Sequence, residues 1–267
     1  MKLLIDAGNT RIKWALVDEG TWLRSGVLPV GQAGELSQQF AGLEGIRQVW
    51  ASNVAGEEIA QHIRAACGSI QPRFIVAQEV QCGVRNGYSS PAQLGSDRWA
   101  ALIAAWHLVR GTCLVVNSGT ATTVDALSAK GEFIGGLILP GVELMRRSLC
   151  AATDQLQAAQ AGKYASFPLN TADALYSGAL QASCGAIERQ HALLGGDCPD
   201  GITSHSTRLS KDDSQVAGYE PGRRGSAPVV LSGGAEEVLR NRLNVPLRIV
   251  DNLVLQGLWL IAQETSA

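Results

Sequence analysis

LLIDAGNTRIKWALVD, residues 3–18, consists of two apolar runs separated by a short polar segment. Each apolar run, 3–5 and 14–17, is typical of a buried β-strand. The residues between them, 6–13, include an acid, a glycine, small polar residues and a lysine. This pattern predicts a strand, a tight corner and a second strand, with the polar groups of the corner held in a cleft.

A similar pattern returns in LVVNSGTATTVDAL, residues 114–127. Residues 5–10 (IDAGNT) align with residues 116–121 (VNSGTA) without a gap. A repeat separated by the length of a small domain indicates duplication. We therefore expect an α/β chain with two similar halves, residues 1–112 and 113–267, each beginning with a strand-corner-strand unit.

A helix is strongly indicated from residue 96. Ser96 is suited to the N-cap position, and Gly111 ends the pattern. Because apolar residues recur between them at helical spacing, we expect a helix with one buried face. That face would consist of Trp99, Leu102, Ile103 and Trp106.

The other elements follow from shorter patterns. The segment 198–228 is rich in Gly, Ser, Asp and Arg and has no apolar period, which predicts a loop. Strands are expected at 49–54, 74–76, 133–141 and 229–231, and helices at 57–67, 142–160, 171–194 and 252–263.

The composition argues against several classes of protein. The chain has 267 residues, 46% of them hydrophobic, which is enough for a substantial globular core. A formal net charge of −2 without runs of like charge gives no basis for binding nucleic acid or an anionic membrane. No signal-peptide pattern and no membrane-spanning run is evident, so we expect a cytoplasmic protein. Six cysteines without a C-x-x-C pair and four isolated histidines do not favour structural zinc or a disulfide framework.

The two corners are suited to binding a polyphosphate. Small residues let backbone N–H groups approach an anion closely, and hydroxyls and amides can bond its oxygens. Neither the P-loop motif nor G-x-G-x-x-G is present. Asp6 could hold Mg²⁺, and Lys13 could place a positive charge near a terminal phosphate. For a single corner, a simple hairpin turn at Gly8 and Asn9 would be an equal explanation, but two matching corners favour the phosphate site.

Short motifs follow one another in a specific order along the chain. That order resembles the type III pantothenate kinases, in the acetate and sugar kinase/Hsp70/actin superfamily, over nearly the whole sequence except the predicted loop. The resemblance implies two RNase H-like α/β halves in an actin-like ATPase fold, with the active site in the cleft between them, and a homodimer. The motifs are DAGNTRIK (6–13), GSDR (95–98), SGTATTVD (118–125), GGLILPG (135–141), NT (170–171), SGG (232–234) and LVLQGL (253–258).

The resemblance also implies a reaction. ATP would transfer its γ-phosphate to the primary hydroxyl of pantothenate, the first step of coenzyme A synthesis, with Mg²⁺ held by Asp6. Gly233 and Gly234 would flank the adenosine. The phosphates would contact residues from both corners: Gly8, Asn9, Thr10 and Lys13 from the first, and Gly119, Thr120 and Thr122 from the second.

Asp97 matches the aspartate that acts as general base in this family. Phosphoryl transfer depends mainly on positioning and charge neutralisation, and one carboxylate can orient the attacking hydroxyl. From the residues alone, a structural explanation is stronger, because a carboxylate in the first turn of a helix interacts favourably with the helix dipole. The resemblance reverses that preference.

The pantothenate site is implied in the same way. Gly95, Ser96, Arg98 and Tyr88 match residues around the substrate, and Thr171 matches a threonine delivered across the dimer interface. From the residues alone, Tyr88 is an ordinary loop aromatic and Thr171 begins a helix beside an Asn170 cap.

One residue departs from the family pattern. The second phosphate motif usually begins with an aspartate that resembles a ligand for a monovalent cation, K⁺ or NH₄⁺, and this chain has Asn117. An amide oxygen can coordinate a cation but lacks the full charge. Asp125, at the end of the motif, keeps some acidity nearby. We therefore expect weak or altered activation by monovalent cations.

Two other functions fit parts of the pattern. One is another small-molecule kinase of the superfamily, from which the combination of Tyr88, the GSDR motif and Thr171 distinguishes a pantothenate kinase. The other is a nucleotide-binding regulatory protein without turnover, and the presence of Asp97 argues against it.

Overall fold

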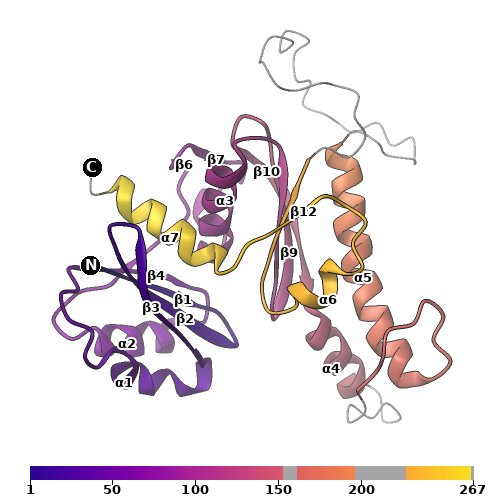
Figure 1. Cartoon of the computed structure of the whole chain (residues 1–267), viewed down its shortest axis with the longest axis horizontal. Helices are drawn as coiled ribbons and strands as arrows, with labels where there is room; N and C mark the ends of the chain where they lie inside the picture. The colour runs from indigo at the N-terminus through magenta and orange to yellow at the C-terminus, as the bar shows by residue number, and fades with distance from the viewer. Residues whose placement is uncertain (153–160, 196–226, 266–267) are drawn as a thin grey trace, which may run out of the picture.

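The computed structural model describes residues 1–152, 161–195 and 227–265 (Figure 1). It contains a five-stranded and a seven-stranded sheet, with helices on both faces of each. The end of the predicted helix 142–160 and almost all of the predicted loop 198–228 lie outside the described residues. In the described part of the chain, no helix is long and apolar enough to cross a membrane.

The first sheet has the strand order β3-β2-β1-β4-β5. β1 is antiparallel to β2, which follows the first corner on one side of it. β1 is parallel to β4, which lies on its other side. Its strands are β1 (Lys2–Ala7), β2 (Arg11–Asp18), β3 (Thr21–Pro29), β4 (Gln48–Asn53) and β5 (Arg73–Phe74).

The second sheet repeats this arrangement. Its order is β12-β11-β8-β9-β10-β7-β6, so β10-β9-β8-β11-β12 corresponds strand for strand to the first sheet. The directions also agree, because β8 is antiparallel to β9 and parallel to β11. The strands are β6 (Val80–Gln81), β7 (Val84–Asn86), β8 (Cys113–Ser118), β9 (Ala121–Leu127), β10 (Glu132–Pro140), β11 (Val229–Ser232) and β12 (Leu247–Ile249).

The duplication inferred from the two corners is therefore confirmed by the topology. The second sheet has one addition, the short hairpin β6-β7, which comes earlier in the chain and pairs with β10. The boundary between residues 112 and 113 stays a prediction about how the repeat is divided.

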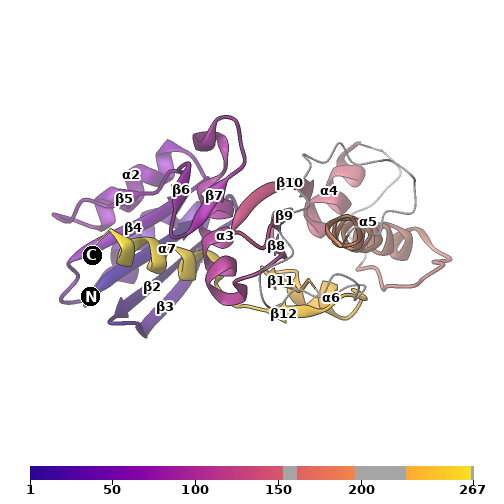
Figure 2. The same cartoon turned by 90° about the horizontal axis from the view of Figure 1, so that it is seen from above.

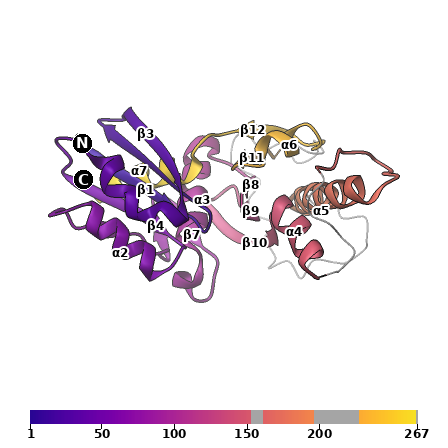
Figure 3. The same cartoon turned by 90° about the horizontal axis from the view of Figure 1, so that it is seen from below.

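The helices form layers around the sheets (Figures 2 and 3). α1 (Leu36–Phe40) and α2 (Glu57–Ala66) cover the outer face of the first sheet. α3 (Ser96–Val109) and α7 (Leu253–Glu264) share one core with the inner faces of both sheets. α4 (Val142–Ala152), α5 (Thr171–Leu194) and α6 (Glu236–Arg240) cover the other face of the second sheet. The central helix α3 thus begins beside both repeated units.

The prediction of one buried face for α3 was wrong. Every residue from Arg98 to Trp106 is buried, because α7 packs closely against the helix on a side that local periodicity would leave to solvent. Gly257 in α7 makes this possible: a Cβ there would overlap the backbone of Ala100. A helix buried on all sides gives a rigid base to whatever its first turn carries.

Candidate active site

The two corners meet in the structure. The first connects β1 to β2, and the second connects β8 to β9. The hydroxyl groups of Thr10 and Thr120 lie 2.5 Å apart across the space between the repeats. Behind the second corner, Ser118 Oγ and Thr122 Oγ1 are 2.8 Å apart and buried, which fixes its shape. The structure therefore brings the hydroxyls of both predicted phosphate motifs together.

Asp6 is the next-to-last residue of β1 and is half-buried. Burial, together with the nearby charge of Asp97, raises the pKa of Asp6 to about 7, although Lys13 opposes the shift. Lys13 is the partner of Asp6 in the β1-β2 ladder. Among the described residues, Asp6 forms no ion pair of its own. A half-buried carboxylate that lacks a fixed counter-ion is suited to a cation.

The donor set fits Mg²⁺ rather than a metal held wholly by protein. No group of three or more His, Cys, Asp or Glu side chains suitable for a metal occurs among the described residues. Mg²⁺ is commonly held by one or two carboxylates, with water and phosphate oxygens completing its shell. Asp6 beside the hydroxyl-lined corners supplies that kind of site.

Asp97 lies in the first turn of α3. Its Oδ1 accepts a hydrogen bond of 2.8 Å from the backbone N–H of Arg98, so the structural role of a helix-start carboxylate is real. Burial nevertheless raises the pKa of Asp97 above its ordinary value. The backbone N–H groups of Arg98 and Asp97 and the charge of Arg98 oppose this shift. Gly95 leaves room for this carboxylate, since a Cβ there would come within 2.7 Å of Oδ1. A carboxylate with a raised pKa can act as a base near neutral pH.

Ser96 does not cap the helix as its sequence position predicts. Gly95 occupies the N-cap position, and no side chain accepts a hydrogen bond there. The Ser96 hydroxyl instead lies 2.9 Å from the hydroxyl of Ser52 at the end of β4, and both residues are buried. Ser52 is one residue of this region that sequence reasoning did not identify.

Arg98 is held from two directions. Its Nε donates to Asp125 Oδ2 at 3.1 Å, and its Nη2 donates to Oδ1 in the same buried ion pair. Its Nη1 donates to the hydroxyl of Tyr88 at 3.1 Å, and the ring of Tyr88 packs on Phe133. Gly136 is required beside the pair, because a Cβ there would overlap Asp125. The sequence assigned Tyr88 and Arg98 to one site, and the structure joins them through a direct hydrogen bond.

A glycine turn lies against the second corner. Gly233 has a φ of +106°, and a Cβ at this position would overlap the backbone of Ser118. The backbone N–H of Ala235 donates to the carbonyl of Ser118 at 3.0 Å, which fastens the turn. Arg11, from the first corner, extends to within 4.0 Å of the Cβ position at Gly234. Its guanidinium is a further cation beside this glycine turn that sequence reasoning missed.

Thr171 lies elsewhere in the chain. It begins α5 after Asn170, whose side chain accepts a hydrogen bond from the backbone N–H of Asp173 at 2.9 Å and so confirms the predicted cap. Thr171 is exposed and lines a groove of about 430 Å³ between α4 and α5. The structure does not bring it to the corner residues within one chain.

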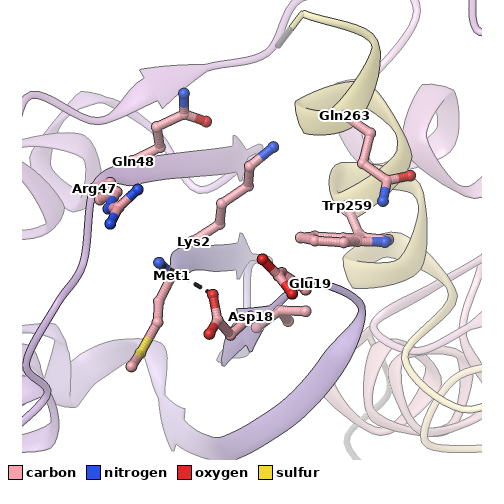
Figure 4. A pocket seen from close by; sticks show the side chains of 9 residues that line it. Met1, Lys2, Asp18, Glu19, Arg47, Gln48, Trp259 and Gln263 are labelled. Atoms are coloured by element: carbon pink, nitrogen blue, oxygen red, sulfur yellow. Dashed lines mark ion pairs between the residues drawn. The ribbon is translucent and has the colours of Figure 1, made fainter. Parts of the chain in front are cut away.

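A separate cavity of about 560 Å³ lies near the N-terminus (Figure 4). The amino group of Met1 is 3.4 Å from Asp18, and the ammonium of Lys2 lies 5.3 Å from the ring centre of Trp259. None of the residues that line this cavity belongs to the ordered motifs. The candidate active site is therefore at the facing corners.

The family model and the relatives that match by sequence agree on one family. The model of the type III pantothenate kinases matches residues 2–192. A type III pantothenate kinase of Nitrosospira multiformis is 46% identical over 266 residues, covering 99% of this chain and 92% of that protein. One from Aromatoleum aromaticum is 46% identical over 269 residues, covering 100% of both.

Solved structures show the fold. A protein of Campylobacter jejuni described as a Baf family transcriptional activator aligns over 99% of this chain and 98% of its own, with a TM-score of 0.57 and 19% identity. One from Sinorhizobium meliloti described as a 2-dehydro-3-deoxygalactonokinase aligns over 99% of both chains, with a TM-score of 0.54 and 15% identity. The duplicated α/β fold that the resemblance implied is confirmed.

Proposed function

This chain belongs to the type III pantothenate kinase family, and we propose that its facing corners and Asp97 transfer the γ-phosphate of ATP to the primary hydroxyl of pantothenate. The observation that carries this assignment is the meeting of the two corners beside Asp6, whose pKa is raised by burial and by the nearby charge of Asp97. The product would be 4′-phosphopantothenate, in the first step of coenzyme A synthesis.

The corners would bind the polyphosphate of ATP. Their backbone N–H groups and hydroxyls can surround phosphate oxygens, and Lys13 and Arg11 add positive charge from β2. Gly233 and Gly234 would lie beside the adenosine, and the absence of a side chain at Gly234 leaves space there. Mg²⁺, held by Asp6, would supply neutralisation of charge on the transferred group. The remaining corner contacts would come from Gly8, Asn9, Gly119 and Thr122.

Asp97 would accept the proton of the attacking hydroxyl. Because its helix is packed on all sides, Asp97 would meet the alcohol from a fixed direction. The raised pKa of Asp97 makes it a stronger base than an ordinary aspartate. Tyr88 and Arg98 would hold the acceptor, with Asp125 orienting the guanidinium through the buried ion pair. Arg98 retains N–H groups beyond these three bonds, and pantothenate carries a carboxylate that could accept from them.

The direct test is ADP release by the purified full chain with Mg·ATP, with and without pantothenate. Strict dependence on pantothenate supports both the reaction and the acceptor. ATP binding without turnover would replace this proposal with a regulatory role, and turnover only with other alcohols would change the acceptor.

Asn117 leads to a prediction about cations. It is partly buried at the end of β8, paired with Ser232 of β11, in the place that Asp6 occupies in the first repeat. Because a neutral amide attracts a monovalent cation less than a carboxylate does, we expect the rate in K⁺ or NH₄⁺ to differ little from the rate in Na⁺. Asn117→Asp should introduce a preference of severalfold. Strong K⁺ dependence of the unmodified protein would contradict this expectation.

We also propose that two copies of the chain form a homodimer. Exposed apolar side chains occur on β10 and α4, namely Ile138, Leu144 and Leu149, and Leu149 also lines the groove beside Thr171. An apolar surface of this kind is typical of a protein interface, and a second copy would bring Thr171 to a site that it does not reach within one chain.

Sedimentation at micromolar concentration tests the assembly. We expect a dimer, and Leu149→Glu should shift it toward monomer and lower turnover. Leu193→Glu, which adds the same charge at a similarly exposed leucine of α5, is the matched control. A monomeric parent chain with full activity would exclude the shared site.

A further inference from the structure

The hydroxyl contact between Ser52 and Ser96 joins β4 to α3, the helix that carries the proposed base. β4 is the neighbour of β1, the strand that carries the proposed metal ligand. Ser52 lies in β4 and pairs with Asp6 of β1 in the parallel ladder. Ser96 is the first residue of α3 and directly precedes Asp97. The two hydroxyl oxygens are 2.9 Å apart.

The register of the strands places this contact on the same side of the sheet as Asp6. Paired residues of neighbouring strands point to the same face of a sheet, and alternate residues share that face. Leu4 and Trp50, two positions before Asp6 and Ser52, both belong to the core that α3 enters. The Asp6 and Ser52 side chains therefore share the sheet face against which the first turn of α3 is placed.

Neither hydroxyl has a local task that would account for it. Ser96 is beside a helix start but does not cap it. Ser52 is completely buried, and Ser96 is 9% exposed. Within the described part of the chain, each hydroxyl has the other as the partner that replaces water. A buried pair of this kind holds its elements at a fixed separation.

We propose that the Ser52–Ser96 hydrogen bond is a positioning device that sets the first turn of α3, and with it Asp97, relative to the end of β1 that carries Asp6. Ser52 is a positioning residue, because it acts through Ser96 and touches no reacting atom. This inference rests on the proposed function and deepens it by assigning a residue outside the ordered motifs.

The test compares three variants with a matched control. Ser52→Ala should lower kcat about tenfold, because displacement of a base from its attack geometry affects the chemical step. KM for Mg·ATP should change less than twofold, since the corners are left intact. Ser183→Ala removes another completely buried hydroxyl, which donates to the carbonyl of Ala179 within α5, and should leave kcat unchanged.

Ser96→Ala and the double variant complete the cycle. If the hydrogen bond is the device, the double variant should be no slower than the slower single variant, because both single changes break the same contact. Ser52→Ala leaves the Ser96 hydroxyl buried without its partner, which can destabilise the protein. The double variant removes both hydroxyls, so its kcat can be measured even if Ser52→Ala is unstable.

The outcomes separate this inference from the function on which it rests. A parent chain without pantothenate-dependent turnover would overturn both. An active parent with kcat of Ser52→Ala and of the double variant within twofold of the parent would overturn the positioning role alone. The positioning role would also be overturned if Ser52→Ala and Ser183→Ala lost the same thermal stability and showed the same fall in kcat.

Discussion

Asp97→Asn is expected to lose at least a hundredfold in kcat while it still binds Mg·ATP. The amide keeps the size of the carboxylate and can occupy the same place in the first turn of α3, but it cannot accept the proton of the attacking hydroxyl. A positioned general base typically contributes about 10²- to 10⁴-fold to the rate. Pantothenate-dependent ADP release measures the loss, and calorimetric titration with Mg·ATP measures the retained binding.

The effect on nucleotide binding has a definite sign. The charge of Asp97 raises the pKa of Asp6, so its removal lowers that pKa and makes Asp6 a better cation ligand near neutral pH. We therefore expect Asp97→Asn to bind Mg·ATP at least as tightly as the parent. A general loss of folding would weaken binding instead.

The matched control for this variant is Asp18→Asn. Asp18 is a half-exposed aspartate at the end of β2 opposite the first corner, and its replacement removes the same charge there. Its kcat should equal that of the parent. If Asp97→Asn retains a near-normal kcat, Asp97 serves only to stabilise the start of its helix, as its hydrogen bond with the Arg98 backbone would suggest on its own.

The corners and the duplication could be predicted because their signals are local. A glycine and small polar residues between two apolar runs indicate a turn wherever the rest of the chain lies. The second copy then repeats the same local pattern, and the matching strand orders of the two sheets confirm the inference. The order of the motifs indicated the family, which neither corner indicates on its own.

The errors concern contacts between distant segments. Ser96 satisfies the rule for a helix cap, yet its hydroxyl bonds to Ser52 because β4 brings a second buried hydroxyl to it. The full burial of α3 depends on α7, which comes near the end of the chain and reaches α3 through Gly257. The ion pair of Arg98 with Asp125 likewise joins α3 to β9 and leaves no periodic signal. Local rules describe one element, and none of these partners is on the same element.

Asp6→Asn is expected to reduce kcat/KM for Mg·ATP by roughly a hundredfold, because it removes the carboxylate proposed to hold Mg²⁺ and the neutralisation of phosphate charge that the metal provides. The affinity for pantothenate should change by less than about threefold, since Tyr88 and Arg98 are held by Asp125 and not by Asp6. Initial rates over a range of Mg·ATP, and direct titration with pantothenate, measure the two effects separately.

The pH dependence of stability tests the role of the Asp6 carboxylate independently of the kinetics. Its pKa in the folded chain is about 7, above the ordinary value of 3.8, so the folded state holds this proton more tightly than the unfolded state does. The associated stability is fully present below about pH 4 and is lost as the pH rises through about 7. In EDTA, the Tm of the parent should therefore fall relative to that of Asp6→Asn over this interval. Mg²⁺ should restore the parent at pH 8 but not the variant, because only the parent has a charged oxygen for the cation to neutralise. Equal Tm profiles for the two proteins, with equal Mg·ATP kinetics, would remove Asp6 from the metal site and leave the corners as a phosphate site alone.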